Sequence, residues 1–438
     1  MSSSAVLPDG PSAPPVVQTA ELTARPVDFV ERCRDRFGGT FSVRLSRIGP
    51  MVFFSDPDSI KQVFASDREN TITQGRNVVL EPILGTKSLL VQEGAEHLAR
   101  RKLMLPPFHG ERMRAYEQSI ERATVEEISN WPTGETILSH PAMQRITLEV
   151  IMSAVFGVSD ERHDPLRAGL NRVLSSTRSP FAFGLTFPLL RKLPPYSGML
   201  KSLRETDRLI AAEISDRRAD PTTEEREDIL SMLVSARDEE GQGLDDTELR
   251  DQLMTLLLAG HETTATALAW CFDQLLRNPD AHERLRSEVD SDGGGDWMEA
   301  VIAETLRVRP VVPMIGRELR KPMTLDGWDL ESGTSVMLSI YLAHTRPDVF
   351  PDPYVFNPSR FDGVKPDTYS WIPFGGGTRR CIGAAFAQFE MRIVLRTILS
   401  TLDLAPGSDS PDQMIRRNVT LSPKHGSPVL ITDRRAAA

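Results

Sequence analysis

Cysteine is scarce in this 438-residue sequence, which contains only Cys33, Cys271 and Cys381. Three widely separated cysteines cannot form a disulfide framework, so we expect a protein of the reducing cytoplasm. Long apolar runs are also missing. No stretch of about 18 apolar residues occurs, and the sequence therefore predicts no transmembrane helix. The first twenty residues lack the basic and apolar regions of a signal peptide. Their Ser, Pro and Ala content predicts a disordered tail over residues 1–20.

The sequence has no excess of positive charge either. Its net charge of −10 argues against a nucleic-acid partner, because a phosphate backbone requires a basic binding surface. Hydrophobic residues at 40% and charged residues at 26% are typical of a soluble globular protein. Length alone suggests two or three domains. Because no linker-like stretch interrupts the middle of the chain, we expect residues 21–438 to form a single domain.

The patterns along the chain predict a mainly α fold with a small β region. Residues 40–54 alternate or run apolar around Ile48-Gly49-Pro50, which predicts a β-hairpin. Residues 114–234 predict a series of amphipathic helices. A long helix is expected from Asp245 to Leu276, ending before Asn278-Pro279.

The most informative segment runs from Phe374 to Gly383 and contains Gly375, two further glycines, Arg379, Arg380 and Cys381. A glycine run lets the backbone approach a flat ligand closely. The start of a helix and two arginines stabilise a thiolate, and an ionised sulfur suits a soft-ligand iron site. Two alternatives are an ordinary loop with a buried cysteine and an anion site at the helix start.

The order Phe-x-x-Gly-x-Arg-x-Cys-x-Gly resembles the haem-ligand loop of the cytochrome P-450 family. The resemblance implies that Cys381 is the thiolate ligand of the iron of haem b, and that Phe374 lies beside the sulfur. It implies that Arg379 binds a haem propionate. Gly375 and Gly383 occupy glycine positions of the same loop. It further implies the family fold, with the haem between the long central helix and the Cys381 helix.

A second motif, Ala259-Gly260-x-Glu262-Thr263, lies within the long predicted helix. Glycine there costs about 1 kcal/mol relative to alanine, and threonine can bend a helix by bonding to the carbonyl one turn back. A close crossing with another helix is the alternative explanation. The motif resembles the family's oxygen-activating turn. By that resemblance Thr263 donates a hydrogen bond, Glu262 relays protons, and Ala259 and Gly260 leave room for haem and oxygen.

Further residues match the family in chain order. His97 and Arg101 are four apart and share a helix face. A solvated basic face is the alternative, but their position resembles the family's propionate-binding helix. Arg317 is expected to reach a propionate as well. Glu304 and Arg307 form a spacing that is common on helix surfaces, yet they resemble the family's Glu-x-x-Arg pair. Arg360 is then the second arginine, and the three are expected to retain the haem.

Several apolar residues are candidates for the substrate pocket, with ordinary core packing as the alternative. Two lie in the apolar loop of residues 71–91, one in a Phe-rich lid segment, one on the long helix and three after the Glu-x-x-Arg helix: Ile83, Leu84, Phe183, Ala259, Val312, Met314 and Ile315. Their chemistry favours a hydrophobic small-molecule substrate.

The resemblance implies a monooxygenase that inserts one oxygen atom from O2 by hydroxylation or epoxidation. We expect a monomer that receives electrons from a separate ferredoxin and its reductase. Arg100, Lys102, Arg112 and Arg114 are candidates for docking an acidic donor. Two rivals are a peroxide-driven or oxidative-coupling member of the same family and a non-enzymatic haem-thiolate sensor.

Overall fold

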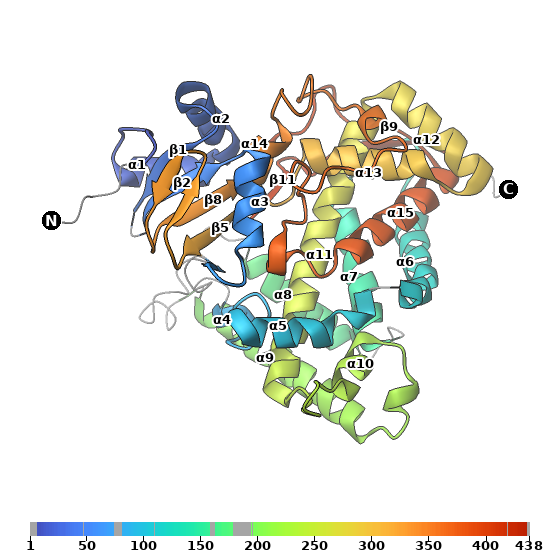
Figure 1. Ribbon diagram of the computed structural model, residues 1–438. Helices are drawn as coiled ribbons and strands as arrows, with labels where there is room; N and C mark the ends of the chain where they lie inside the picture. The colour runs from blue at the N-terminus through green and yellow to red at the C-terminus, as the bar shows by residue number, and fades with distance from the viewer. Residues whose placement is uncertain are drawn as a thin grey trace.

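A computed structural model of the chain describes residues 7–46, 48–73, 81–108, 110–157, 163–177, 194, 196–417 and 419–435. The candidate pocket residue Phe183 lies outside these residues. In Figure 1, helix α11 (Asp246–Leu276) crosses the middle of the molecule, with a β region on one side and helices around the rest. The predicted mainly α architecture with a small β region is confirmed.

The helices account for most of the described chain. The remaining α-helices are α1 (Pro15–Ala24), α2 (Pro26–Phe37), α3 (Pro57–Ala65), α4 (Glu81–Leu84), α5 (Gly94–Met104), α6 (Glu117–Ser129), α7 (Ser139–Phe156), α8 (Asp164–Thr177), α9 (Tyr196–Ala219), α10 (Ile229–Ser235), α12 (Pro279–Asp292), α13 (Asp296–Val308), α14 (Ile340–His344) and α15 (Ala384–Thr401). The short 3-10 turns are η1 (Pro106–Phe108), η2 (Gly110–Tyr116), η6 (Thr223–Glu225), η7 (Pro358–Arg360) and η8 (Gly377–Arg379). None of the helices in these residues is long and apolar enough to cross a bilayer.

The largest sheet has the strand order β1-β2-β8-β5-β3. Its strands are β1 (Phe41–Leu45), β2 (Gly49–Phe54), β3 (Thr71–Thr73), β5 (Met314–Leu319) and β8 (Ser335–Ser339). The smaller sheets are β4 (Thr136–Leu138) with β12 (Pro428–Arg434) and β9 (Leu402–Pro406), β6 (Met323–Leu325) with β7 (Trp328–Leu330), and β10 (Met414–Arg417) with β11 (Thr420–Pro423). The predicted hairpin is confirmed: β1 pairs antiparallel with β2, and the rings of Phe41 and Phe53 stack at 5.1 Å.

The N-terminal segment is ordered, so the prediction of a disordered tail is wrong for residues 7–20. Helix α1 begins at Pro15, a residue whose missing N–H is tolerated in a first turn. Gln18 is 1% exposed, and its side-chain oxygen accepts from the Arg44 backbone N–H over 2.9 Å. The Asp9 carbonyl accepts from the Ser42 N–H over 3.0 Å. These bonds to β1 order the segment, and composition cannot reveal such tertiary contacts.

Helix α11 has the predicted extent, since it runs from Asp246 to Leu276 with Asp245 as its N-cap. The Asp245 side chain accepts from the Glu248 N–H, and the Glu248 side chain accepts from the Asp245 N–H in return. Most of the helix is buried on all sides, and it packs against α7, α13 and α15 in the main hydrophobic core. The helix is therefore a rigid central element on which a site can be built.

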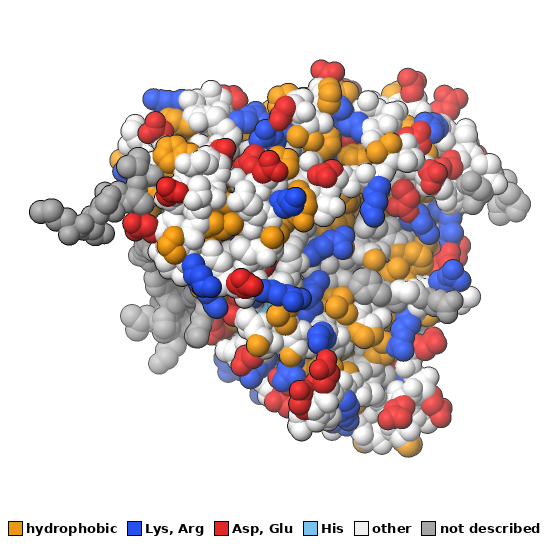
Figure 2. Space-filling view, in the orientation of Figure 1, with side chains coloured by type: hydrophobic (Ala, Val, Ile, Leu, Met, Phe, Trp, Pro, Cys, Tyr) orange, Lys and Arg blue, Asp and Glu red, His pale blue; other side chains and the backbone are white. Residues whose placement is uncertain are grey.

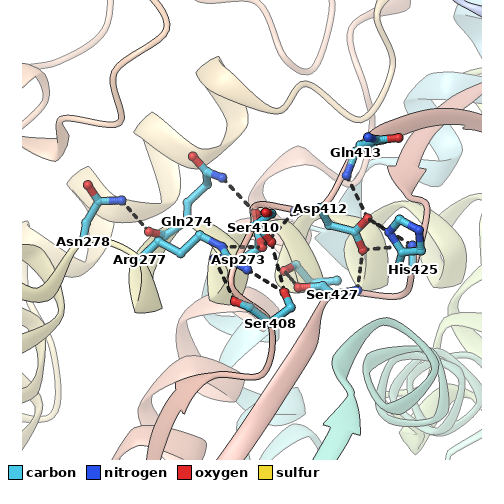
Figure 3. A network of polar contacts seen from close by, with 11 residues as sticks. Asp273, Gln274, Arg277, Asn278, Ser408, Ser410, Asp412, Gln413, His425 and Ser427 are labelled. Carbon is cyan, nitrogen blue, oxygen red and sulfur yellow. Dashed lines mark hydrogen bonds and ion pairs between the residues drawn. The ribbon is translucent and has the colours of Figure 1, made fainter.

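Buried carboxylates attach the C-terminal part of the chain to the end of α11 (Figure 3). Asp412 accepts from the backbone N–H groups of His425 and Ser427 and from the His425 ring, at 2.8–3.0 Å. Asp273 of α11 accepts from Arg277 over 3.0 Å and from the Asp412 backbone N–H over 3.4 Å. This network fixes the segment that precedes the β10–β11 hairpin, and the hairpin in turn meets α11 through its own contacts.

Side chains of α11 hold residues 81–92 against that helix through hydrogen bonds. The Asp251 carboxylate accepts from the Lys87 N–H over 2.9 Å, and the Gln252 side-chain oxygen accepts from the Leu89 N–H over 3.0 Å. Gly85 has φ +88°, and a Cβ at that position would collide with the Asp251 carboxylate. The close approach of this segment to α11 therefore requires a glycine.

We expect Gly85→Ala to lower the free energy of unfolding by about 2–4 kcal/mol, because it adds left-handed backbone strain to a steric clash. Urea denaturation followed by circular dichroism measures this. Gly333→Ala is the matched control, since Gly333 also has positive φ, at +84°, but nothing lies within 4 Å of its missing side chain. Equal losses in the two variants would show that the Asp251 contact contributes nothing.

Candidate functional site

The segment with the Phe-x-x-Gly-x-Arg-x-Cys-x-Gly pattern forms a tight loop before α15. The Cys381 N–H donates to the Phe374 carbonyl over 2.9 Å, which closes the loop. The Phe374 ring packs edge-on against Trp371 at 6.2 Å. A Cβ on Gly376 would collide with the Phe64 ring of α3. At this glycine, the close approach that the sequence predicts is to the protein's own helix α3.

Cys381 is the exposed cysteine, whereas the other two are buried. Cys381 can be reached by solvent, but protein atoms lie around most of it. This burial raises the pKa of the thiol above its ordinary value. The Gly383 N–H and the cations Arg101 and Arg380 act in the opposite direction on that pKa. Helix α15 begins three residues later, at Ala384. Of the cations around the sulfur, Arg101 comes from α5 and is not a neighbour in sequence.

One face of α11 is accessible in the middle of an otherwise buried helix. Ala259 is exposed, Leu258 and Thr263 are half-buried, and the turns before and after are buried. The Thr263 hydroxyl donates to the Ala259 carbonyl over 2.7 Å, the bond to the preceding turn that the sequence predicts. The helix is continuous at this point. The small Ala259 and the hydroxyl of Thr263 are therefore accessible on a helix that packs against α15 as a whole element.

Gly260 is half-buried and lies between this accessible face and α7. A Cβ on Gly260 would lie 3.3 Å from Ile151 Cδ1 of α7. The absence of a side chain therefore lets α7 and α11 cross closely, which was the alternative explanation for this glycine. The role of leaving room for haem and oxygen stays a prediction.

Glu262 also points toward α7. Gln144 Nε2 donates to Glu262 Oε2 over 2.7 Å, and His140 Nε2 lies 3.7 Å from Glu262 Oε1. The Glu262 side chain is 16% exposed. The carboxylate and the Thr263 hydroxyl are thus adjacent in sequence but lie on different faces of the helix.

The pair His97 and Arg101 lies on α5, as their spacing predicts. His97 is 4% exposed, and burial followed by the charges of Arg379 and Arg101 lowers its pKa to about 4. It is therefore a neutral donor or acceptor at physiological pH. Burial and the neighbouring Arg380 and Arg379 lower the pKa of Arg101, while Cys381 acts to raise it. The structure thus brings the α5 pair to the Cys381 loop.

The other two arginines expected at the propionates each pair with a carboxylate of the protein. Arg317 Nε lies 2.8 Å from Asp67 Oδ1, and both side chains are buried. Arg379 lies 2.7 Å from Glu93. A cavity of about 230 Å³ lies between these pairs and His97. The arginines are therefore held in place by the protein itself.

Asp67 and His344 are two residues that the sequence reasoning missed. Besides Arg317, Asp67 accepts from the Thr71 hydroxyl over 2.7 Å and from the Thr378 N–H over 3.1 Å. A Cβ on Gly377 would collide with the Asp67 carboxylate. No local signal marks the role of Asp67, because its partners Arg317 and Thr378 lie more than 200 residues away along the chain.

Glu304 lies between two arginines, as predicted. Arg307 donates to both oxygens of Glu304 at 2.7 Å, and both side chains are 0% exposed. Arg360 Nε lies 3.4 Å from Glu304 Oε1, and the Asn357 N–H donates to the same oxygen over 2.8 Å. This bidentate, buried arrangement excludes the surface-pair alternative.

His344 connects this cluster to the Cys381 loop. Arg307 donates to the His344 carbonyl over 2.8 Å, and the Ile372 N–H donates to His344 Nε2 over 2.8 Å. The acceptor role of Nε2 places the ring proton on Nδ1, which lies 3.3 Å from the Arg307 carbonyl. Burial and the Arg307 charge lower the pKa of His344 to about 3, so the ring is neutral.

The structure divides the described pocket candidates into two groups. Ile83 and Leu84 are buried in the main core, which favours the core alternative for both. Val312, Met314 and Ile315 are half-buried. Met314 packs on the N-terminal core, whereas Ile315 Cδ1 would lie 3.5 Å from a Cβ on Gly375 in the Cys381 loop. Ile315 is thus the candidate with a demonstrated position beside the loop.

Comparisons with known proteins agree with this geometry. The protein-family model described as Cytochrome P-450 matches residues 8–429. The chain is 38% identical to "Putative cytochrome P-450 135B1" of Mycobacterium tuberculosis, over 99% of this chain and 93% of that protein.

The chain belongs to the cytochrome P-450 family.

A second relative, "Putative cytochrome P-450 138" of the same species, is 36% identical over 96% of this chain and 98% of its own length. Among solved structures, the retinoic acid-bound cyanobacterial CYP120A1 superimposes with a TM-score of 0.86 at 24% identity, covering 99% of this chain and 100% of the other. The haem domain of cytochrome P-450DA gives 0.84 at 21% identity, with 98% coverage of both. These two likenesses show the cytochrome P-450 fold.

Cytochromes P-450 bind haem b, and the residues present fit it. The accessible sulfur of Cys381 is the soft ligand that haem-thiolate iron requires. Arg101 near the sulfur and the neutral His97 on the same helix are suitable donors for propionates. The accessible face of α11 offers Ala259 and Thr263 on an element that packs against the Cys381 helix. Arg317 and Arg379 line the same cavity as His97, and the carboxylates of Asp67 and Glu93 hold them in place there.

We expect Glu304→Ala to yield cytochrome P-450 without haem, because it leaves two buried guanidinium groups uncompensated at a cost of about 3–5 kcal/mol. Absorbance of the purified protein measures the haem content. Glu299→Ala on the same helix is the control. Its pair with Arg392 spans 2.9 Å at 42–46% exposure, and such a pair is worth less than about 1 kcal/mol. A normal haem content in Glu304→Ala would contradict the structural role.

We expect His344 to lower the free energy of unfolding of the cytochrome P-450 as the pH falls. Its pKa is about 3 when folded, against an ordinary value of 6.5, so the unfolded chain binds the proton first. Stability from this residue is present above pH 6.5 and is lost as the pH falls toward 3. Urea denaturation at several pH values should show a shallower pH dependence for His344→Gln, by up to about 1.4 kcal/mol per pH unit. Identical slopes for His344→Gln and the parent would refute the effect.

Proposed function

We propose that this cytochrome P-450 inserts one oxygen atom from O2 into a hydrophobic small molecule by C–H hydroxylation or epoxidation. The electrons come from a separate ferredoxin and ferredoxin reductase. The observation that carries the proposal is the arrangement on α11, where Thr263 lies on an accessible face and Glu262 lies on the adjoining face. When bound, haem would supply the iron at which O2 is reduced, and Cys381 would supply the thiolate ligand that favours O–O cleavage.

The protein residues supply the protons and the shape of the site. The Thr263 hydroxyl donates to the Ala259 carbonyl and has acceptor capacity left for a further donor. It is therefore able to hold a water on that side of α11, and its own proton is available to a second acceptor when it leaves the Ala259 carbonyl. Glu262 is a carboxylate in contact with polar groups of α7 and can take up and release protons. Ala259 is small and leaves this face open.

The same pair favours O2 chemistry over the peroxide-driven rival. Peroxide already carries the two electrons and its own protons, so a member that uses it has little need for an acid next to a threonine. Glu262 and Thr263 are both present, and both have defined hydrogen-bond partners. Oxidative coupling remains a reaction that product analysis will distinguish from oxygen insertion.

The docking of an acidic ferredoxin is supported by cations near the Cys381 loop. Arg112, Arg114 and Arg380 are exposed. Arg100 and Lys102 are weaker candidates, because Arg100 pairs with Glu248 at 2.7 Å and Lys102 pairs with an acidic residue of the loop before α11. On the face shown in Figure 2, basic and acidic side chains are interspersed. We therefore expect donor binding that weakens with salt.

The substrate is proposed to be a medium or large apolar molecule. Half-buried Val312, Met314 and Ile315 lie on the β5 segment and the turn before it, and Ile315 approaches the Cys381 loop. The neighbour CYP120A1 is described as bound to retinoic acid. Long isoprenoid or fatty carboxylic acids therefore belong in the first set of compounds, screened by the spectral shift that accompanies loss of the iron-bound water.

We expect Thr263→Val to lower the yield of oxygenated product per electron pair by about 10²-fold, since a positioned proton donor is worth 10²–10⁴. Product formation with a ferredoxin system and isotopically labelled O2 measures this. Thr264→Val is the matched control, because Thr264 is the next residue along the helix and is buried, at 3% exposure. Turnover with hydrogen peroxide and none with the ferredoxin system would favour the peroxide rival, and no O2 consumption with any reductant would favour a sensor.

A further inference from the structure

Helix α7 presents one stripe of three polar residues and an isoleucine to the turn of α11 that carries Glu262 and Thr263. Residues spaced four, three and four apart lie on one face of a helix. The members of this stripe, in order along α7, are His140, Gln144, Thr147 and Ile151. In Figure 1, α7 lies alongside the middle of α11. Their partners on α11 are Thr266, Glu262, His261 and Gly260.

The contacts of the stripe differ in what they hold. Gln144 and His140 reach the Glu262 carboxylate, at 2.7 Å and 3.7 Å. His140 Nε2 also lies 3.1 Å from the Thr266 hydroxyl, which fixes the imidazole plane. Thr147 reaches His261, with its hydroxyl 3.0 Å from both the ring Nδ1 and the carbonyl of that residue, and it also lies 3.5 Å from the Gln144 carbonyl. Gln144 and His140 therefore contact the Glu262 carboxylate, whereas Thr147 connects the two helices without contacting it.

These contacts are buried, so they restrict the carboxylate strongly. His140 is 1% exposed and Gln144 is 9% exposed. A hydrogen bond to an ionised acceptor is stronger than a neutral one, and low polarity around it strengthens it further. Because Glu262 and Thr263 are about 100° apart around the helix, α11 alone does not direct the carboxylate to the hydroxyl. Its position is set by α7.

We propose that Gln144 and His140 are positioning residues for the proton relay: they hold Glu262 in the orientation from which it exchanges protons with the side of α11 that carries Thr263. This inference rests on the proposed function, because it assumes that Glu262 relays protons during O2 cleavage. Gln144 supplies the direct hydrogen bond to the carboxylate. His140 supplies the second contact and connects it to Thr266.

The test compares Gln144→Met with Thr147→Val in the haem-loaded protein. Met has the length of Gln but no donor, and Thr147→Val changes the same stripe without touching Glu262. We expect Gln144→Met to lower product per electron pair about tenfold, with the electrons recovered as hydrogen peroxide and a larger solvent deuterium isotope effect. Thr147→Val should keep the parent ratio and isotope effect. A parental ratio in Gln144→Met, or an equal loss in Thr147→Val, would overturn the proposal.

A measurement that does not depend on turnover completes the test. Urea midpoints of Gln144→Met, Glu262→Met and the double variant should be non-additive, because each single change removes the same hydrogen bond. Additive shifts of the urea midpoint would show that the side chains of residues 144 and 262 do not interact, and would overturn the proposal. If Glu262→Met forms product at the parental ratio while the midpoints remain non-additive, the positioning contact stands and the proton-relay role in the proposed function fails.

Discussion

The buried carboxylate of Glu304 is the constraint on which the site depends. A charge without water must be compensated by partners with good geometry, and Arg307, Arg360 and the Asn357 N–H provide them. The remaining donors of Arg307 reach carbonyls at residues 344, 353 and 355. His344 continues the chain of contacts to the Ile372 N–H, two residues before Phe374. The loop that presents the sulfur is thereby connected to the core through a series of buried polar bonds.

Arginines are also paired with carboxylates in the second group of residues around the Cys381 loop. Arg317 and Arg379 are compensated by Asp67 and Glu93, and Asp67 also bonds to the loop itself. Arg101 acts on the sulfur from α5, on which His97 stays neutral because it is buried. The cations around the cofactor site therefore have different roles. Some organise the protein, and others are placed to meet the sulfur or the propionates of haem.

The extent of successful prediction follows from the range of each interaction. The Glu304 cluster, the helix from 246 to 276 and the Thr263 bond to Ala259 follow from spacings of three or four residues, and a helix makes such neighbours predictable. The ordered segment 7–20 was missed because its hydrogen bonds go to β1. Asp67 was missed for the same reason, since its partners are far along the chain.

By itself, the sequence determined the order of the motifs and the helices that carry them, and it predicted Cys381 as the ligand cysteine, because each depends on residue type and local spacing. Only the tertiary structure decided where the side chains of the oxygen-activating turn point. Gly260 meets Ile151, Glu262 meets Gln144, and the Thr263 hydroxyl bonds to the exposed Ala259. The physical reason is that a helix distributes consecutive residues around its axis, and its neighbours determine which direction is buried, polar or open.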